Sequence, residues 1–258
     1  NIQLYFTGAL LFLGMLNPVF ANKLPENHAV NGGVTIIPIE TAQKPEAFYQ
    51  NKPIPVIPGD NKNEWLIVVG IPLENTQSIQ YITLKRPTRT TIPFHVSDKY
   101  YRTQSLTIDN KRKVDPNDED QIRIEAENKK LAKIFAHYTP MNPFKEEFKA
   151  PSQGPVSSLF GLKRVYNQQP RAPHSGLDIA SPANSPVHVI SGGKVVDTSD
   201  YFFTGNTVIV DHGMGVFSLY AHLKQIDVHP GEVVKQGDVV GTVGMTGRVT
   251  GPHLHWTM

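Results

Sequence analysis

Two histidines near the end of this 258-residue sequence, His253 and His255, are of a type and spacing that could do chemistry. They are two residues apart, so on a β-strand both imidazoles point to one face while Leu254 and Trp256 point to the other. A pair of this kind alone is most simply two solvent-facing histidines. The case for a functional site therefore depends on further residues.

A second cluster, His174 and Asp178, makes a functional site more plausible than two solvent-facing histidines. Pro173 and Gly176 disfavour a helix there, and Asp178 leads into a short apolar run. Imidazole and carboxylate together suit zinc. One aspartate and two histidines supply three ligands and leave a fourth position for water, which is typical of catalytic rather than structural zinc sites. A single carboxylate leaves the site net cationic, which favours lowering the pKa of the bound water.

A third element ends a predicted strand at His222, which by itself is most simply a buried structural histidine. The composition restricts the other chemistry that is open to the chain. It contains no Cys, which excludes disulfides, thiolate metal sites and cysteine nucleophiles. Any catalysis must therefore use oxygen, imidazole or a metal that they hold.

The charge of the chain is nearly balanced. Lys and Arg number 25 and Asp and Glu number 23, which gives a net charge of +2. A partner chosen by bulk electrostatic attraction, such as nucleic acid or anionic lipid, is not favoured. We therefore expect no nucleic-acid partner.

The elements that must position these residues are mainly β-strands. Short β-branched runs bounded by Pro, Gly and Asn predict a small β-rich domain and then a compact all-β domain without any helical period. The first set of strands is expected at residues 34–39, 65–69, 79–84, 91–96 and 104–108. The second set is expected at 187–190, 193–196, 206–210, 216–222, 239–243 and 253–257.

One long helix is expected between the two domains, at about residues 117–138. Asp115 is the expected N-cap and Pro116 the first helical residue, with acidic residues in the first turn and lysines toward the end, as the helix dipole favours. Residues 139–155 contain four prolines and little periodicity, which predicts a linker. We therefore expect an N-terminal accessory or regulatory domain at 22–145 and a second domain at 146–258.

The first 21 residues are expected to be a signal peptide. Residues 1–22 carry no charge, an apolar run covers residues 4–16, and Ala21 supplies a small residue for cleavage. Asn17 and Pro18 stop this run short of the ~20 residues that span a bilayer, so export is favoured over anchoring and no stable membrane span is expected in the mature form. The expected location is the periplasm, with secretion as the alternative. No closing element follows His255, so we expect the natural chain to continue after Met258.

The ordered motifs resemble a known family. His174-x-x-x-Asp178, Tyr220-Ala-His222 and Gly251-Pro-His253-Leu-His255-Trp256 are similar to the lysostaphin and LytM-type zinc endopeptidases of bacterial cell walls. The resemblance covers nearly all of residues 151–258. Residues 26–33 and 65–72 resemble the amino-terminal domain that accompanies this peptidase in some Gram-negative proteins.

The resemblance implies a fold and a set of roles. The second domain would be a duplicated hybrid-motif β-sandwich in which His174, Asp178 and His255 bind zinc. His222 and His253 would activate water and steady the oxyanion, and the spacing leaves open which of them is the base. The other histidines of this domain match no functional position: His188, His212 and His229.

One departure concerns the basic residue that follows Phe160-Gly161. Many relatives have Arg at position 163, whereas this chain has Lys163 followed by Arg164. The departure bears on substrate contacts rather than on the metal.

The function that the resemblance implies is metal-assisted hydrolysis of the peptide cross-links of peptidoglycan. The alternative is a non-catalytic module that binds the cell wall or activates an amidase, because some relatives keep the fold and lose the ligands. A secreted enzyme that attacks a competitor's wall would differ in target and not in chemistry. We also expect the N-terminal domain to fold over the zinc cleft and inhibit the enzyme; binding to the wall or to a partner is the alternative.

Overall fold

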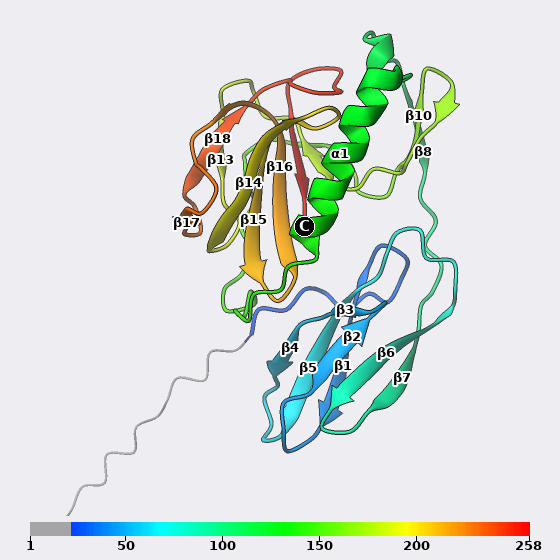
Figure 1. The fold of residues 1–258 in the computed structure, drawn as a ribbon, viewed down its shortest axis with the longest axis vertical. Helices are drawn as coiled ribbons and strands as arrows, with labels where there is room; N and C mark the ends of the chain where they lie inside the picture. Colours follow the sequence, from blue (N-terminus) through cyan, green and yellow to red (C-terminus); the bar gives the residue numbers. More distant parts are fainter. Residues whose placement is uncertain (1–21) are drawn as a thin grey trace, which may run out of the picture.

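The computed structural model describes residues 22–258, which form two lobes placed end to end (Figure 1). Both lobes are built mainly of β-strands, which confirms the predicted fold class. The predicted signal peptide, residues 1–21, lies outside the described residues. Within residues 22–258 no helix combines the length and the apolar character needed to cross a bilayer.

The first lobe contains two small antiparallel sheets, one in the order β1-β5-β4 and the other in the order β3-β2-β6-β7. Their buried apolar side chains form one cluster that includes Tyr49, Ile67 and Ile82. Four strands agree with prediction, whereas β2, β3 and β4 were not predicted because two to four residues are too few to show an alternating pattern. The strands are β1 (Val34–Glu40), β2 (Glu46–Tyr49), β3 (Lys52–Pro53), β4 (Val56–Pro58), β5 (Glu64–Gly70), β6 (Ile79–Arg86) and β7 (Thr90–His95).

The strand predicted at 104–108 exists as β8 (Thr103–Leu106), but its assignment to the first domain is wrong. It pairs in parallel with β10 (Lys163–Tyr166), which also pairs with β11 (Gln169–Pro170). An alternating pattern predicts that a strand forms and does not identify its partner. The first half of the chain therefore supplies a strand to the second lobe.

The second lobe is organised by a nine-stranded sheet in the order β17-β14-β15-β16-β19-β12-β9, with β13 and β18 joined to it through β16. Its core contains Val208, Tyr220 and Leu254, none of which has exposed surface. Residues 151–258 contain no helix, as predicted. The strands are β9 (Val156–Ser158), β12 (Leu177–Ile179), β13 (Pro186–His188), β14 (Gly193–Tyr201), β15 (Gly205–Gly213), β16 (Val216–Ile226), β17 (Val233–Val234), β18 (Val239–Val243) and β19 (Leu254–Thr257).

The predicted helix is α1 (Asp118–Phe135), and it follows a short 3-10 turn, η1 (Lys111–Lys113). Asp115 is not its N-cap. The Asn117 side chain accepts a hydrogen bond from the Asp120 backbone N–H, and the Asp120 carboxylate accepts one from the Asn117 N–H. This reciprocal capping box satisfies two N–H groups at once, which a cap at Asp115 would not do.

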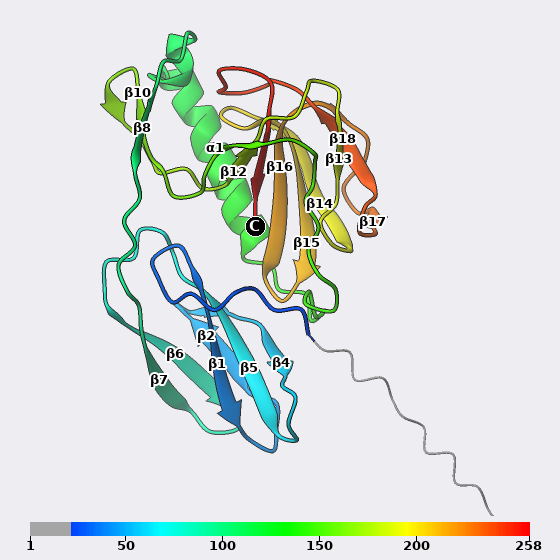
Figure 2. The same cartoon turned by 180° about the vertical axis from the view of Figure 1, so that it is seen from behind.

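Helix α1 is attached to the second lobe. In both views it lies between β16 and the β8–β10 pair (Figures 1 and 2). Lys130 Nζ lies 2.5 Å from Asp197 Oδ1 on β14, and the Glu127 carboxylate accepts a hydrogen bond of 2.9 Å from the Phe202 N–H. The helix is therefore held largely by polar contacts.

The predicted linker, residues 139–155, has no helix or strand, as expected. It is nevertheless packed against the second lobe. Thr139 Oγ1 donates a hydrogen bond of 2.6 Å to Asp211 Oδ2, and Glu146 Oε1 accepts from the Ser191 hydroxyl. The segment thus has a fixed path over the sheet.

His212, on β15, is a fully buried structural residue. Its Nδ1–H donates to the Gly192 carbonyl at 2.9 Å, and its Nε2 lies 2.7 Å from Ser218 Oγ, which in turn contacts the Tyr220 hydroxyl at 2.9 Å. Burial lowers the pKa of His212, and the nearby carboxylates of Asp211 and Glu146 only partly oppose this. The ring is therefore neutral in the folded protein.

We expect His212 to make the fold sensitive to acid. The pKa of His212 is lower in the folded chain than in the unfolded chain, where it is about 6.5. Its contribution to the free energy of unfolding is therefore complete above about pH 6.5 and decreases as the pH falls below this value. The decrease is limited to about 1.4 kcal/mol per pH unit. Urea unfolding at about pH 7.5 and about pH 5.5 should show a smaller loss of stability for His212→Gln than for the unsubstituted chain. Equal losses in the two proteins would contradict this role.

Candidate metal centre

The candidate site forms where β19 lies between β12 and β16. Asp178 on β12 is the register partner of His255 on β19, and His255 is the partner of Ala221 on β16. These three residues therefore form one row across the sheet, with His222 directly after Ala221. Because side chains that are directly opposite on neighbouring strands point to the same side of a sheet, Asp178 and His255 share one face.

His174 comes from the loop before β12, and backbone hydrogen bonds hold it in place. Its N–H donates to the Leu162 carbonyl at 2.9 Å, and its own carbonyl accepts from the Gly161 N–H at 2.8 Å. The imidazole Nδ1–H donates to the Leu159 carbonyl at 2.8 Å. Because a carbonyl can only accept, the neutral ring carries its lone pair on Nε2, which faces Asp178.

The ring of His255 is oriented in a comparable way by Thr257. The Thr257 hydroxyl donates to the Ser175 carbonyl at 3.2 Å, so its oxygen can accept a hydrogen bond from His255 Nε2–H at 3.1 Å. The lone pair of the neutral ring is then on Nδ1. Partners of this kind fix the tautomer and direction of histidines that bind metals.

Three acceptor atoms converge as a result. His174 Nε2 lies 2.9 Å from Asp178 Oδ1 and 3.0 Å from His255 Nδ1, and the distance between the last two atoms is 2.8 Å. All three side chains are buried. Three lone pairs facing one another in a buried place repel unless a cation or a proton lies among them. Two imidazoles and a carboxylate are zinc ligand types, so the donor set fits this metal.

The pKa values agree with a ligand set in its binding form. Burial alone would raise the pKa of Asp178, but the hydrogen bonds and positive charge that His174 and His255 supply when protonated outweigh this effect and hold the pKa well below its ordinary value. A cation in place of those protons would act on the carboxylate in the same direction. Burial lowers the pKa of His255. At neutral pH the carboxylate is therefore ionised and the His255 ring is neutral, which are the forms that bind a metal ion.

The other two predicted residues, His222 and His253, lie beside this cluster. Their ring centroids are 4.8 Å apart, and the His222 ring is 5.8 Å from that of His255. His222 Nδ1–H donates to the Thr246 carbonyl and His253 Nδ1–H to the Gly251 carbonyl, at 2.8 and 2.9 Å. This leaves Nε2 of each ring as the atom that can carry a lone pair.

His222 also has a strained backbone, with a φ of 62°. Its N–H donates to the Thr204 carbonyl at 2.9 Å, which helps to hold this conformation. Left-handed geometry in a residue other than glycine concentrates at functional sites. Burial, together with the charges of His253 and His255, lowers the pKa of His222 to about 3. The His222 ring is therefore neutral near pH 7.

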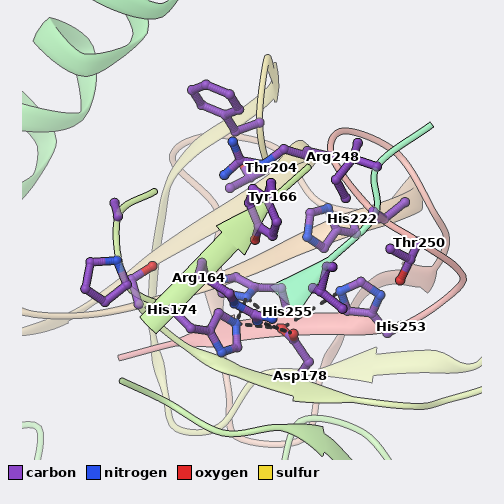
Figure 3. A pocket seen from close by; sticks show the side chains of 17 residues that line it. Arg164, Tyr166, His174, Asp178, Thr204, His222, Arg248, Thr250, His253 and His255 are labelled. Carbon is purple, nitrogen blue, oxygen red and sulfur yellow. Dashed lines mark hydrogen bonds and ion pairs between the residues drawn. The ribbon is translucent and has the colours of Figure 1, made fainter. Parts of the chain in front are cut away.

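All five side chains line one cleft with a volume of about 240 Å³. Figure 3 shows Asp178 beside the rings of His174 and His255, with His222 and His253 next to this group and Tyr166, Thr204 and Arg248 farther along the cleft. Leu106 and Ile108, from β8 and the residues after it, form part of the wall. The three remaining histidines of this lobe, His188, His212 and His229, do not line the cleft.

Sequence reasoning missed the role of Arg164. It considered the basic residues after Gly161 only as substrate contacts, but Arg164 is buried and its Nη2 lies 3.1 Å from Asp178 Oδ2, while Lys163 is exposed. Arg164 also donates to Gln104 on β8. The arginine therefore holds the carboxylate oxygen that faces away from the cluster. The available signal was that neighbouring residues on a strand point to opposite faces, so that only one of Lys163 and Arg164 can face the interior.

The fold and the site together define a β-rich protein with a candidate metal centre. Residues 27–99 match the family model of the peptidase family M23 N-terminal domain, and residues 172–258 match that of peptidase family M23. A crystal structure from Pseudomonas aeruginosa described as a candidate M23 peptidase is 38% identical, covers 89% of both chains and has a TM-score of 0.74. The chain belongs to peptidase family M23.

Curated relatives match less than half of the chain. Peptidoglycan DD-endopeptidase ShyA of Vibrio cholerae is 39% identical over 114 residues, which are 44% of this chain and 26% of ShyA. Cell division protein DipM of Caulobacter vibrioides is 36% identical over 115 residues, which are 44% of this chain and 18% of DipM. The aligned region spans about a quarter of these relatives' length or less.

Arg164→Lys should weaken zinc binding by about tenfold, as loss of a partner behind a metal ligand typically does. The lysine keeps the charge and loses the fork of donors that joins Asp178, Ser158 and Gln104. Zinc affinity can be measured by competition with a chromogenic chelator, with Lys163→Arg as the matched control. An unchanged affinity in Arg164→Lys would show that the arginine does not position the carboxylate.

Proposed function

We propose that the chain is a zinc-dependent endopeptidase that hydrolyses peptide cross-links of bacterial peptidoglycan. The observation that carries the proposal is the convergence of His174 Nε2, Asp178 Oδ1 and His255 Nδ1 within 3.0 Å of one another in a cleft. Membership of a peptidase family supports hydrolysis of a peptide bond. The names of the relatives, which include peptidoglycan DD-endopeptidases, support the substrate.

His174, Asp178 and His255 would hold the zinc. When bound, zinc supplies a Lewis acid that polarises the scissile carbonyl and activates a water molecule at neutral pH. The protein's own contribution is orientation. Leu159, Thr257 and Arg164 fix the direction of the three ligand side chains, so that the site needs little rearrangement to bind the metal.

His222 and His253 would handle the proton. A neutral ring with Nδ1–H bound to a carbonyl can accept a proton from water on Nε2. The protonated ring can then donate Nε2–H, either to the oxyanion of the tetrahedral intermediate or to the leaving amine. Two such rings 4.8 Å apart can divide these tasks.

Two further expectations remain proposals. We expect the mature protein to act in the periplasm, because its substrate would lie there and the sequence predicts a signal peptide. The non-catalytic alternative, a wall-binding or amidase-activating module, would not need two further histidines in the same cleft as a metal site. The presence of all five side chains in one cleft favours the enzyme.

His255→Ala should abolish both zinc retention and the release of peptides from purified sacculi. The change removes one of three protein ligands and so opens a second coordination position to solvent. Bound zinc can be measured by elemental analysis, and released peptides by mass spectrometry. The matched control is His229→Ala, because this exposed histidine contacts Glu232 outside the cleft. Peptide release that survives His255→Ala would contradict the proposal.

The expected inhibition by the amino-terminal half is also a proposal, and the structure refines its test. No residue from 22 to 99 lines the cleft, whereas Leu106 and Ile108 do. Deleting residues 22–150 would remove β8 and Gln104 and would therefore damage the site itself.

Deletion of residues 22–99 retains β8 and Gln104. It therefore tests whether the first lobe inhibits the enzyme without damaging the candidate site. If the first lobe limits access to the cleft, the shortened protein should release wall peptides faster than the full chain. The rate of release from sacculi, with a thermal melt of both proteins as control, measures the effect. Unchanged turnover of a folded shortened protein would contradict inhibition and favour a binding role for this lobe.

A further inference from the structure

One cationic side chain in the cleft is not used by the proposed chemistry. Arg248 lies on the loop between β18 and β19 and lines the same cleft as the histidines (Figure 3). Its guanidinium carbon is 4.6 Å from the centroid of the Tyr166 ring and 4.3 Å from that of Phe203. Two aromatic rings therefore hold the planar group by cation–π contacts.

The loop that carries Arg248 is held firmly. The Arg248 N–H donates to the Phe203 carbonyl at 2.8 Å. The backbones at Gly205 and Gly247 approach so closely that a Cβ at Gly205 would lie 2.6 Å from the Gly247 nitrogen. The position of the guanidinium is therefore set before any ligand binds, which lowers the entropy that binding costs.

Arg248 lacks an anionic partner. None of the ion pairs among residues 22–258 includes it, and residues 1–21 contain no Asp or Glu. Among residues 22–258, its guanidinium donates to one carbonyl, from Nη1 to Lys113, and this hydrogen bond is 3.4 Å long. Burial and the charges of Arg171 and Arg164 lower the pKa of Arg248, although a guanidinium stays charged near pH 7. A partly buried charge without a counter-ion is costly.

The cleft as a whole is short of negative charge. Asp178 is the single carboxylate among the described residues that line it, and Arg164 and the histidines already occupy both of its oxygens. Arg248 would therefore find its counter-ion in a bound ligand. A planar guanidinium presents paired N–H donors that match a carboxylate.

We propose that Arg248 is a specificity-determining residue that binds a carboxylate of the substrate peptide and so selects acidic over amidated peptides. This inference rests on the proposed function, because the stem peptides of peptidoglycan carry free carboxylates. It adds a recognition residue to the metal and proton-handling side chains. Arg248 touches the substrate away from the scissile bond and takes no part in proton transfer.

The test compares free-carboxylate and fully amidated forms of two probes, using the zinc-loaded full chain. A cross-linked wall-peptide dimer reports kcat and KM, and a single wall tetrapeptide, which has no cross-link to cut, reports affinity by calorimetry. We expect the unsubstituted protein to prefer the carboxylate form of each probe by about tenfold or more, since hydrogen bonds to charged groups contribute that much. Arg248→Gln should remove the preference by raising KM and Kd for the carboxylate forms only.

Two variants keep the test decisive. Arg248→Lys retains the charge without the planar fork and should restore part of the preference, and a thermal melt shows whether each variant folds. Arg171→Gln removes a nearby arginine that is paired with Asp115 and does not line the cleft, so it should leave the preference intact. The proposal would be overturned if Arg248→Gln raised KM and Kd equally for the carboxylate and amidated probes, or if Arg171→Gln removed the preference for the carboxylate probes as well.

The calorimetric arm separates this inference from the proposed function. If the protein cuts no dimer but Arg248 still controls the preference for the carboxylate tetrapeptide, the proposed hydrolysis fails and carboxylate recognition stands. If the dimer is cut at equal rates in both forms, hydrolysis stands and the assignment of Arg248 fails.

Discussion

Three electron-pair donors held close together in a buried place are the constraint on which the second lobe depends. Two imidazole lone pairs and a carboxylate oxygen repel one another at separations of 2.8 to 3.0 Å unless a positive charge lies among them. The surrounding chain makes this arrangement hard to relax. The Leu159 carbonyl and the Thr257 hydroxyl fix the two rings, and Arg164 fixes the carboxylate. These contacts orient three lone pairs toward one point, and a cluster of this kind could hold a metal ion.

Strand register explains how residues 81 positions apart reach this geometry. Because β19 is inserted between β12 and β16, the row that contains Asp178 and His255 continues to Ala221. His222, the next residue along β16, has a left-handed backbone, and its side chain lines the same cleft. The first half of the chain contributes as well. Strand β8 pairs with β10 and brings Gln104 to Arg164, so the site is assembled from both halves of the sequence.

The sequence predicted the β-rich fold, the helix and the candidate residues because each of these leaves a pattern in a short stretch of sequence. The alternation around His255 and the apolar runs of β15 and β16 are long enough to show a period. Pairing partners are not local, so the sequence placed β8 in the wrong lobe. Capping depends on which side chain meets which N–H, and Asn117 displaced Asp115 for this reason. Arg164 was not linked to Asp178 because their contact depends on tertiary packing over 14 positions.

The central claim is that His174, Asp178 and His255 together bind one metal ion. Diffraction data collected on both sides of the zinc absorption edge, from crystals of the full chain prepared with zinc, test it most directly. The account predicts one strong anomalous peak about 2.0–2.2 Å from His174 Nε2, His255 Nδ1 and an Asp178 oxygen. A peak at a different set of side chains, or none in the cleft, would contradict it.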